Sequence, residues 1–150
     1  MRPDGRPSGS GDPEQARVFF ALWPDAATAA ALRTLAQGCA REFGGRAGRC
    51  ETLHLTLAFV GDVPLDHLSV LREVAAAVTA PAGEVCLDRL GFWAHNRILW
   101  AGTSAVPPEL GQLVRRLGAG LKAAGAAGKA GGGRSFVPHV TLVRKLAGPV

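Results

Sequence analysis

The sequence has 150 residues, of which 47% are hydrophobic and 19% charged, and it carries a formal net charge of +5. This length suits one soluble globular domain with one sizeable core and is too short for two comfortable domains. The excess of basic over acidic residues favours an anionic partner such as nucleic acid. No apolar stretch is long enough to cross a bilayer, and three cysteines without a CxxC pair predict reduced thiols in the cytoplasm.

The predicted elements alternate between strand and helix. Residues 1–16, rich in Pro, Gly, Ser and charge, predict a disordered tail ahead of one domain over 17–150. The elements expected in that domain, in chain order, are a strand over 17–23, a helix from Asp25 to Gly44, a strand over 51–62, a helix over 63–80, a hairpin over 84–103, a helix from Pro108 to 122, a low-complexity loop over 123–134 and a strand over 135–146. This order predicts an α+β fold with helices outside a mixed or antiparallel sheet.

The strand over 51–62 is apolar on one face only. Side chains alternate along a strand, so two sets are expected to face opposite ways. The core set is Leu53, Leu55, Leu57 and Phe59, and the other set is His54, Thr56, Ala58 and Val60. An imidazole and a hydroxyl therefore share one face of a strand that otherwise resembles a buried one.

The same pattern returns in the last predicted strand. The letters HVTL at 139–142 repeat HLTL at 54–57, so that His139 and Thr141 again share one face. Two copies of this HXTX motif are hard to explain as satisfied core histidines. His67 and Ser69 have the same spacing, but they lie in a predicted helix, where residues two apart point in nearly opposite directions. His95 falls in a predicted turn and is expected at the surface.

Two imidazoles and two hydroxyls in one cleft suit the opening of a cyclic phosphodiester by water. One imidazole takes the proton of water, and the other gives a proton to the leaving oxygen. Each Thr hydroxyl can donate to a non-bridging phosphate oxygen. A zinc site would need three or four converging ligands, which neither motif supplies, so no metal and no cofactor are expected.

The two motifs and their flanks, RVFFALWPD, ETLHLTLAFVGDVP, GFWAHNRILWAG and FVPHVTLVRK, resemble the two-histidine phosphoesterase superfamily over residues 17–147. Within it they resemble the RNA 2',3'-cyclic phosphodiesterase branch, historically called 2'-5' RNA ligase. The resemblance implies a bilobal α+β fold, each lobe giving one motif to a central cleft. It also implies metal-independent hydrolysis of RNA 2',3'-cyclic phosphate ends to 2'-phosphate ends, and leaves reversible ligation open.

The resemblance also assigns roles to residues. His54 is expected to be the proton donor and His139 the proton acceptor, while Thr56 and Thr141 hold the phosphate. Arg144 lies where the family contacts substrate, although a solvated charge at a strand end is an equal alternative. The aromatic residues that could stack a nucleobase are Phe20, Phe92, Trp93, Trp100 and Phe136, of which Phe20 is our choice.

This sequence departs from the family at its end. Members normally continue beyond the second motif with further strands, whereas this sequence ends at Val150. We therefore expect the strand that carries His139, or a neighbour, to present an unpaired edge beside the cleft. Two other functions stay open at this point: an RNA-end or nucleotide binding module with little catalysis, and a structural domain with the two motifs on separate surfaces.

Overall fold

The computed structural model describes residues 13–126 and 136–148. The elements in this part of the chain are β1 (Gln15–Leu22), α1 (Ala26–Phe43), β2 (Arg46–Ala47), the 3-10 turn η1 (Cys50–Thr52), β3 (Leu55–Pro64), the 3-10 turn η2 (Leu65–His67), α2 (Leu68–Ala77), β4 (Arg89–Trp93), β5 (Ile98–Gly102), α3 (Pro108–Ala123) and β6 (His139–Arg144). The predicted α+β class is confirmed. Strand β1 starts two residues inside the predicted tail. The rest of that tail up to residue 12, and most of the predicted loop over 123–134, lie outside the described residues.

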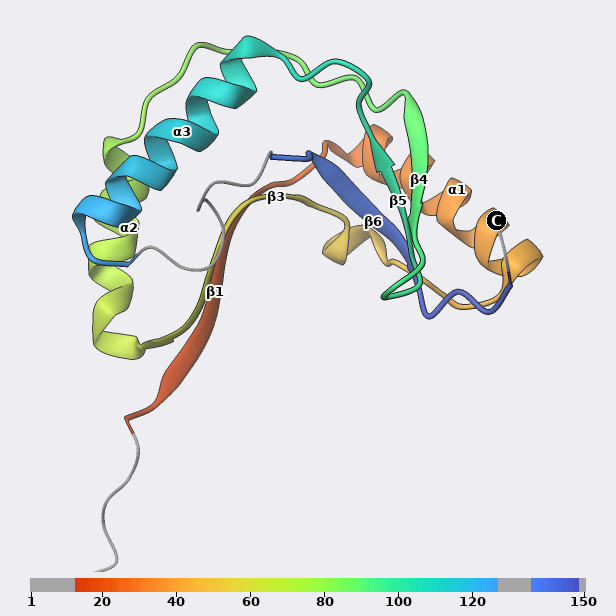
Figure 1. Cartoon of the computed structure of the whole chain (residues 1–150), viewed down its shortest axis with the longest axis horizontal. Helices are drawn as coiled ribbons and strands as arrows, with labels where there is room; N and C mark the ends of the chain where they lie inside the picture. The colour runs from red at the N-terminus through yellow and green to blue at the C-terminus, as the bar shows by residue number, and fades with distance from the viewer. Residues whose placement is uncertain (1–12, 127–135, 149–150) are drawn as a thin grey trace, which may run out of the picture.

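The sheet is antiparallel throughout, with strand order β1-β3-β6-β5-β4 and with β2 paired to β6. Strands β3 and β6 pair at one position only, Leu55 opposite Val140. Figure 1 shows the result as an arch of two lobes. The first lobe comprises β1 and β3 with α2 and α3, and the second comprises β2, β4, β5 and β6 with α1. The bilobal architecture implied by the family resemblance is therefore present.

The chain passes back and forth between the lobes. Helix α1 follows β1 of the first lobe but packs against β2 and β6 of the second. Helix α3 follows β5 of the second lobe but packs against β3 and α2 of the first. Neither lobe is therefore a continuous segment of the chain.

The core lies between the sheet and the helices. Helix α1 buries Leu32 and Ala36, and α3 buries Leu117 and Leu121. The most deeply buried large side chains, all at 1% exposure or less, are Leu53, Leu99, Leu142, Val143 and Leu146. Fully burying one such side chain stabilises the fold by about 1.5–3 kcal/mol. Leu142 and Val143 come directly after the threonine of the second motif, so the core anchors that motif.

Strand β6 lies inside the sheet and not at its edge. It pairs with β5 on one side and with β3 and β2 on the other. The expectation of an unpaired edge is therefore wrong for β6, because the last strand inserts between strands that come earlier in the chain. Within the described sheet, the strands that pair on one side only are β1, β4 and β2, and β2, a neighbour of β6, lines the cleft, so the expected edge lies on a neighbour.

No helix in residues 13–126 and 136–148 has both the length and the apolarity that crossing a membrane requires.

Helix α1 begins where the sequence predicts, because Asp25 caps it. The Asp25 carboxylate accepts a hydrogen bond of 2.7 Å from the backbone N–H of Thr28, and this bond holds the pKa of Asp25 below its ordinary value. The helix ends at Gly44, whose φ of 78° suits glycine.

Asp25→Ala is expected to lower Tm by about 2–4 °C near neutral pH, because it removes this cap. Since the folded-state pKa is lowered, the stabilisation is present above the unfolded pKa of the carboxyl and is lost as the pH falls through the lower folded value. The difference in Tm between the two proteins should therefore shrink in acid. Thermal melts at several pH values check this, and Asp25→Asn, which keeps a cap acceptor, is the control. A difference that grows in acid contradicts the assignment.

Candidate active site

The first motif lies at the start of β3. Leu53, Leu55 and Leu57 are at most 9% exposed, as the alternation predicts, while His54 and Thr56 are half-buried. The second motif starts β6, where Val140 and Leu142 are buried and His139 and Thr141 are half-buried. Each motif thus presents one imidazole and one hydroxyl from a strand whose other face is fixed in the core.

A β-bulge follows each motif threonine. Along β1, Ala21 lies opposite Thr56 and Phe20 opposite Ala58, so Leu57 is the extra residue in β3. A bulge places two residues opposite one and reverses the alternation beyond it. Ala58 is accordingly 5% exposed and buried beside Leu57, so its predicted place on the face of His54 and Thr56 is wrong.

The bulge in β6 is equivalent. Along β5, Trp100 lies opposite Thr141 and Leu99 opposite Val143, so Leu142 is the extra residue. Leu142 and Val143 are both fully buried, and the next residue, Arg144, is exposed and lines the same cleft as Thr141. Without the bulge, strict alternation would turn Arg144 away from Thr141. The bulge at Leu142 therefore places the Arg144 side chain in the cleft, which alternation along the sequence does not predict.

Both histidine rings are held in the same way. His54 Nδ1 lies 2.7 Å from the carbonyl oxygen of Thr52, and His139 Nδ1 lies 2.8 Å from that of Val137. A carbonyl oxygen only accepts, so Nδ1 must carry the proton in each ring. Nε2 is then left to accept a proton when the ring is neutral and to donate one when it is charged. Both rings are thus prepared for acid/base chemistry through Nε2.

Aromatic rings flank each histidine. The His54 ring stacks on Phe19 and Trp23, with centroids at 4.9 and 5.1 Å, and Trp23 Nε1 donates to the Glu51 carbonyl oxygen at 3.3 Å. The Trp93 ring meets His139 edge-on at 4.6 Å. These contacts restrict ring rotation, and they leave Trp23 55% exposed beside His54.

The two motifs meet in one cleft of about 890 Å³. Because Leu55 lies opposite Val140, antiparallel geometry sets His54 level with Thr141 and Thr56 level with His139. The strands pair nowhere else, so they separate and open the cleft. Its lining includes all four motif residues together with Arg46, Arg49, Trp93 and Arg144.

The motif hydroxyls are free to bind a ligand. Among the residues that line the cleft, the side chains that form hydrogen bonds are those of Thr52, His54 and His139. Within residues 13–126 and 136–148, neither Thr56 nor Thr141 has a hydrogen-bond partner for its hydroxyl. Two half-buried donors without protein partners suit an oxygen-rich anion between the strands.

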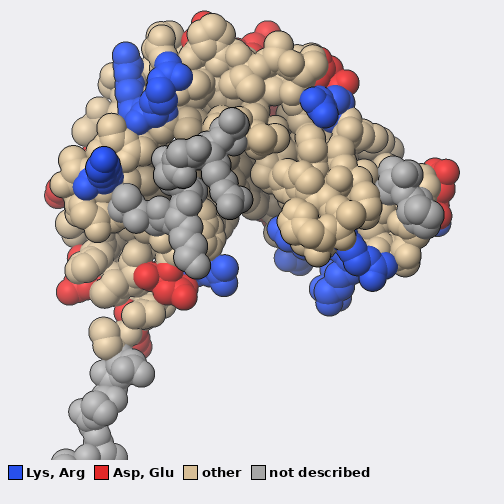
Figure 2. All heavy atoms as spheres, viewed as in Figure 1, with Lys and Arg blue, Asp and Glu red and all other residues tan. Residues whose placement is uncertain are grey.

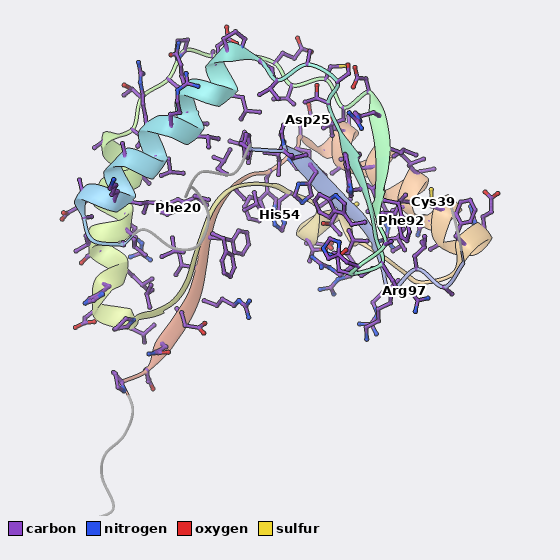
Figure 3. All side chains as sticks on the ribbon, in the orientation of Figure 1. Phe20, Asp25, Cys39, His54, Phe92 and Arg97 are labelled. Carbon is purple, nitrogen blue, oxygen red and sulfur yellow. The ribbon has the colours of Figure 1, made fainter. Side chains whose placement is uncertain are left out.

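The structure brings together the four motif residues and Arg144, but not Phe20. Phe20 packs against the core on the side of β1 that faces α2 and α3, whereas His54 lies on the other side of β3 (Figure 3). Phe92 and Phe136 also pack against the core. The residue that reaches His54 is Phe19, the neighbour of Phe20. Alternation along β1 predicts that these two phenylalanines face opposite ways, but not which of them lies against His54.

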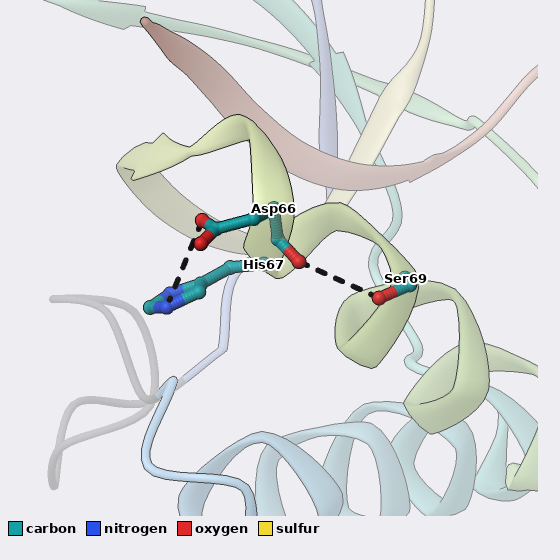
Figure 4. A network of polar contacts seen from close by, with 3 residues as sticks. All are labelled: Asp66, His67 and Ser69. Carbon is teal, nitrogen blue, oxygen red and sulfur yellow. Dashed lines mark hydrogen bonds and ion pairs between the residues drawn. The ribbon is translucent and has the colours of Figure 1, made fainter. Parts of the chain in front are cut away.

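The other two histidines lie outside the cleft lining. His67 is exposed in η2, with Nε2 4.0 Å from Asp66 Oδ1, and the Ser69 hydroxyl donates to the Asp66 carbonyl oxygen at 3.5 Å (Figure 4). His95 is exposed in the turn between β4 and β5. Sequence reasoning missed Phe19, Trp23, Arg46, Arg49 and Thr52. The run GGRAGR just before the first motif was the available signal for the two arginines.

The part of the chain that the structure describes contains no group of three or more His, Cys, Asp or Glu side chains that could hold a metal ion. The donors that converge in the cleft are imidazole, hydroxyl and guanidinium groups. This donor set fits a phosphate better than a cation.

Comparison with known proteins gives a consistent result. Residues 21–149 match the model of the 2'-5' RNA ligase superfamily. The chain is 33% identical over 134 residues to the RNA 2',3'-cyclic phosphodiesterase of Escherichia coli K12, covering 87% of this chain and 73% of that protein.

Two solved structures are similar as well. E. coli LigT complexed with 3'-AMP superposes with a TM-score of 0.80 at 30% identity, covering 91% of this chain and 77% of LigT. TT0787 of Thermus thermophilus gives 0.74 at 27% identity, with 90% and 78% covered. The family match spans both HXTX motifs and the cleft between them, and the chain belongs to the 2'-5' RNA ligase superfamily.

Proposed function

We propose that the protein is a hydrolase that opens RNA 2',3'-cyclic phosphate ends to 2'-phosphate ends. The observation that carries the proposal is the pair of histidines in one cleft, each with Nδ1 bound to a carbonyl oxygen and Nε2 left for proton transfer. The E. coli relative is named RNA 2',3'-cyclic phosphodiesterase, and the LigT structure carries 3'-AMP, a ribonucleotide with a phosphate on its ribose.

In the proposed mechanism, neutral His139 takes a proton from water as the water oxygen bonds to phosphorus. The bond from phosphorus to the ribose 3' oxygen breaks, and protonated His54 gives its proton to that oxygen. The phosphate stays on the 2' oxygen, so atoms and charges balance with water as the only co-reactant. Arg144, from the same cleft, contacts the phosphate as a cation.

Each histidine works beside a threonine of the other motif. His54 is level with Thr141, and Thr56 is level with His139. Thr56 and Thr141 donate to the two non-bridging oxygens and stabilise the charge that develops there. Phe19 and Trp23, in place of Phe20, take the role of stacking against the terminal nucleobase, since they lie against His54 and Trp23 is exposed.

A cytoplasmic location belongs to the same proposal. The three cysteines, Cys39, Cys50 and Cys86, all stand free in the structure, which suits a reducing compartment.

The proposal is tested with an oligoribonucleotide that ends in a 2',3'-cyclic phosphate. Because the two imidazoles supply both proton transfers, hydrolysis is expected to proceed at the same rate with and without EDTA. The product should resist a phosphatase specific for 3'-phosphomonoesters, since the phosphate stays on the 2' oxygen.

Three results would count against it. Loss of activity in EDTA that a divalent metal restores would overturn the mechanism. A 3'-phosphate product would reverse the choice of leaving oxygen. Binding of the cyclic end without turnover would favour the alternative of an RNA-end binding module.

A further inference from the structure

The catalytic cleft contains more positive charge than one cyclic phosphate requires. Arg46 in β2 lies directly opposite Arg144 in β6, and both line the cleft. Like charges directly opposite each other on neighbouring strands destabilise a sheet. Within residues 13–126 and 136–148, the only ion pair within 4.0 Å is that of His67 and Asp66, so no carboxylate offsets this repulsion. An anionic ligand would offset it.

Local backbone features fix this arginine pair in place. Gly45 has a φ of 95°, and a Cβ there would lie 2.7 Å from the Arg144 carbonyl oxygen, so only glycine lets β2 approach β6 at this point. The backbone N–H of Gly48 donates to the carbonyl oxygen of Leu142, the bulged residue, at 2.7 Å. The repulsive pair is therefore built into the sheet.

Arg49 extends the positive charge beyond the catalytic groups. It lines both the cleft and an adjoining pocket of about 350 Å³, whose lining also contains Arg33, Cys50 and Glu51. Arg33 donates to the Gly48 carbonyl oxygen at 3.3 Å. Basic side chains gather along the underside of the second lobe, where Arg97 lies, and no acidic side chain shows among them in that view (Figures 2 and 3).

Arg49 is tied to His54 through one residue. The Thr52 hydroxyl accepts from the Arg49 backbone N–H at 3.2 Å and donates to the Arg49 carbonyl oxygen at 3.0 Å, while the Thr52 carbonyl oxygen binds His54 Nδ1. These bonds hold the Arg49 backbone at a fixed position relative to His54, the proposed proton donor. Its exposed side chain has no hydrogen-bond partner in the described part of the chain.

We propose that Arg46 and Arg49 bind the backbone phosphates on the 5' side of the terminal nucleotide. The preferred substrate is then an oligonucleotide and not a nucleoside 2',3'-cyclic phosphate. The inference rests on the proposed function, in which Thr56, Thr141 and Arg144 already engage the single charge of the cyclic phosphate. The next anions along an RNA end are its phosphodiesters, and guanidinium groups are well suited to bind them.

The test compares kcat and KM for a nucleoside 2',3'-cyclic phosphate and for a di- and a tetranucleotide with the same cyclic end. The unsubstituted protein should favour the tetranucleotide in kcat/KM by about 10-fold or more, mainly through KM. Arg46→Gln and Arg49→Gln should each reduce that preference several-fold. The slope of log kcat/KM against log salt on the tetranucleotide should become shallower by about 0.7 for each phosphate that is no longer neutralised.

The matched control is Arg72→Gln, which removes the same charge from the exposed side of α2 in the first lobe. It should leave the preference and the salt slope unchanged. A cyclic mononucleotide with an added 5'-phosphate distinguishes a general affinity for a second phosphate from recognition of the chain. If the kcat/KM of this mononucleotide equals that of the tetranucleotide, the proposed preference for an oligonucleotide is wrong.

Stability gives a readout that does not depend on turnover. Removing one member of the repulsive pair by Arg46→Gln should raise Tm by about 1–3 °C at low salt, and the gain should fade as salt screens the charges. The inference would be overturned if Arg46→Gln and Arg49→Gln lost the same fraction of the rate on all three substrates. It would also be overturned if the unsubstituted protein showed no preference for the tetranucleotide. Failure to hydrolyse any cyclic end would overturn the proposed function instead.

Discussion

Replacing either His54 or His139 by alanine is expected to lower kcat by about 10²–10⁴-fold, the range that positioned acid/base groups supply. In the proposed mechanism each ring carries one proton transfer through Nε2, and the other titratable side chains that line the described cleft are arginines, which have no acceptor atom. Single-turnover rates on an oligonucleotide with a cyclic end measure the loss directly.

The other two histidines serve as controls. His67 and His95 are exposed and outside the cleft lining, so their alanine variants should keep the rate of the unsubstituted protein. Groups that act as a unit lose function non-additively, and the variant lacking both His54 and His139 should be little worse than either single variant. Similar modest losses at all four histidines would remove the basis of the assignment.

The same two variants separate acid from base. A substrate with sulfur in place of the bridging 3' oxygen has a leaving group that needs no proton. It should restore much of the rate to His54→Ala and little to His139→Ala. The opposite pattern would make His139 the acid and His54 the base, and the catalytic site would be the same. Bound-substrate affinity, measured separately, shows whether either ring acts through binding alone.

The repeated motif could be predicted from sequence because its signal is local. Strand alternation places His54 with Thr56 and His139 with Thr141 without any tertiary information. Helix α1 was equally predictable, since Asp25 caps its start and Gly44 ends it. In both cases the residues that determine the conformation lie within a few positions of one another.

The bulges at Leu57 and Leu142 could not be predicted, because they are defined by the partner strand. Leu57 is an extra residue only in relation to β1, and Leu142 only in relation to β5. Both bulges bury the residue that follows, Ala58 or Val143, and the second one turns Arg144 into the cleft. The prediction for Ala58 was wrong for this reason.

Long-range placement could not be read from the sequence for a similar reason. Whether Phe19 or Phe20 lies against His54 depends on which side of β1 the helices α2 and α3 cover. The position of β6 in the middle of the sheet depends on its pairing with β3 and β5, two strands that are distant from it in the sequence. The pairing of Arg46 with Arg144 depends on the register of β2, a strand of two residues that carries no periodic signal.

Thr56→Val and Thr141→Val are each expected to lower kcat by about 10²-fold or more, the usual loss for one donor to a developing oxyanion. Valine keeps the shape of threonine and its preference for a strand, so the loss reports the hydroxyl. Neither hydroxyl has a protein partner in the described part of the chain, and the substitution therefore breaks no internal hydrogen bond. Pre-steady-state rates separate this loss from any change in binding.

Serine at the same positions is the matched control. Thr56→Ser and Thr141→Ser restore the donor and should recover most of the rate, because strand-end side chains at half-buried positions lose little packing with one methyl group. Thr103→Val removes a threonine hydroxyl that bonds only to Ala105 outside the cleft lining, and it should not affect turnover. If valine proves as active as serine at positions 56 and 141, the hydroxyls do not hold the phosphate. The repeated threonine would then serve the sheet and not the chemistry.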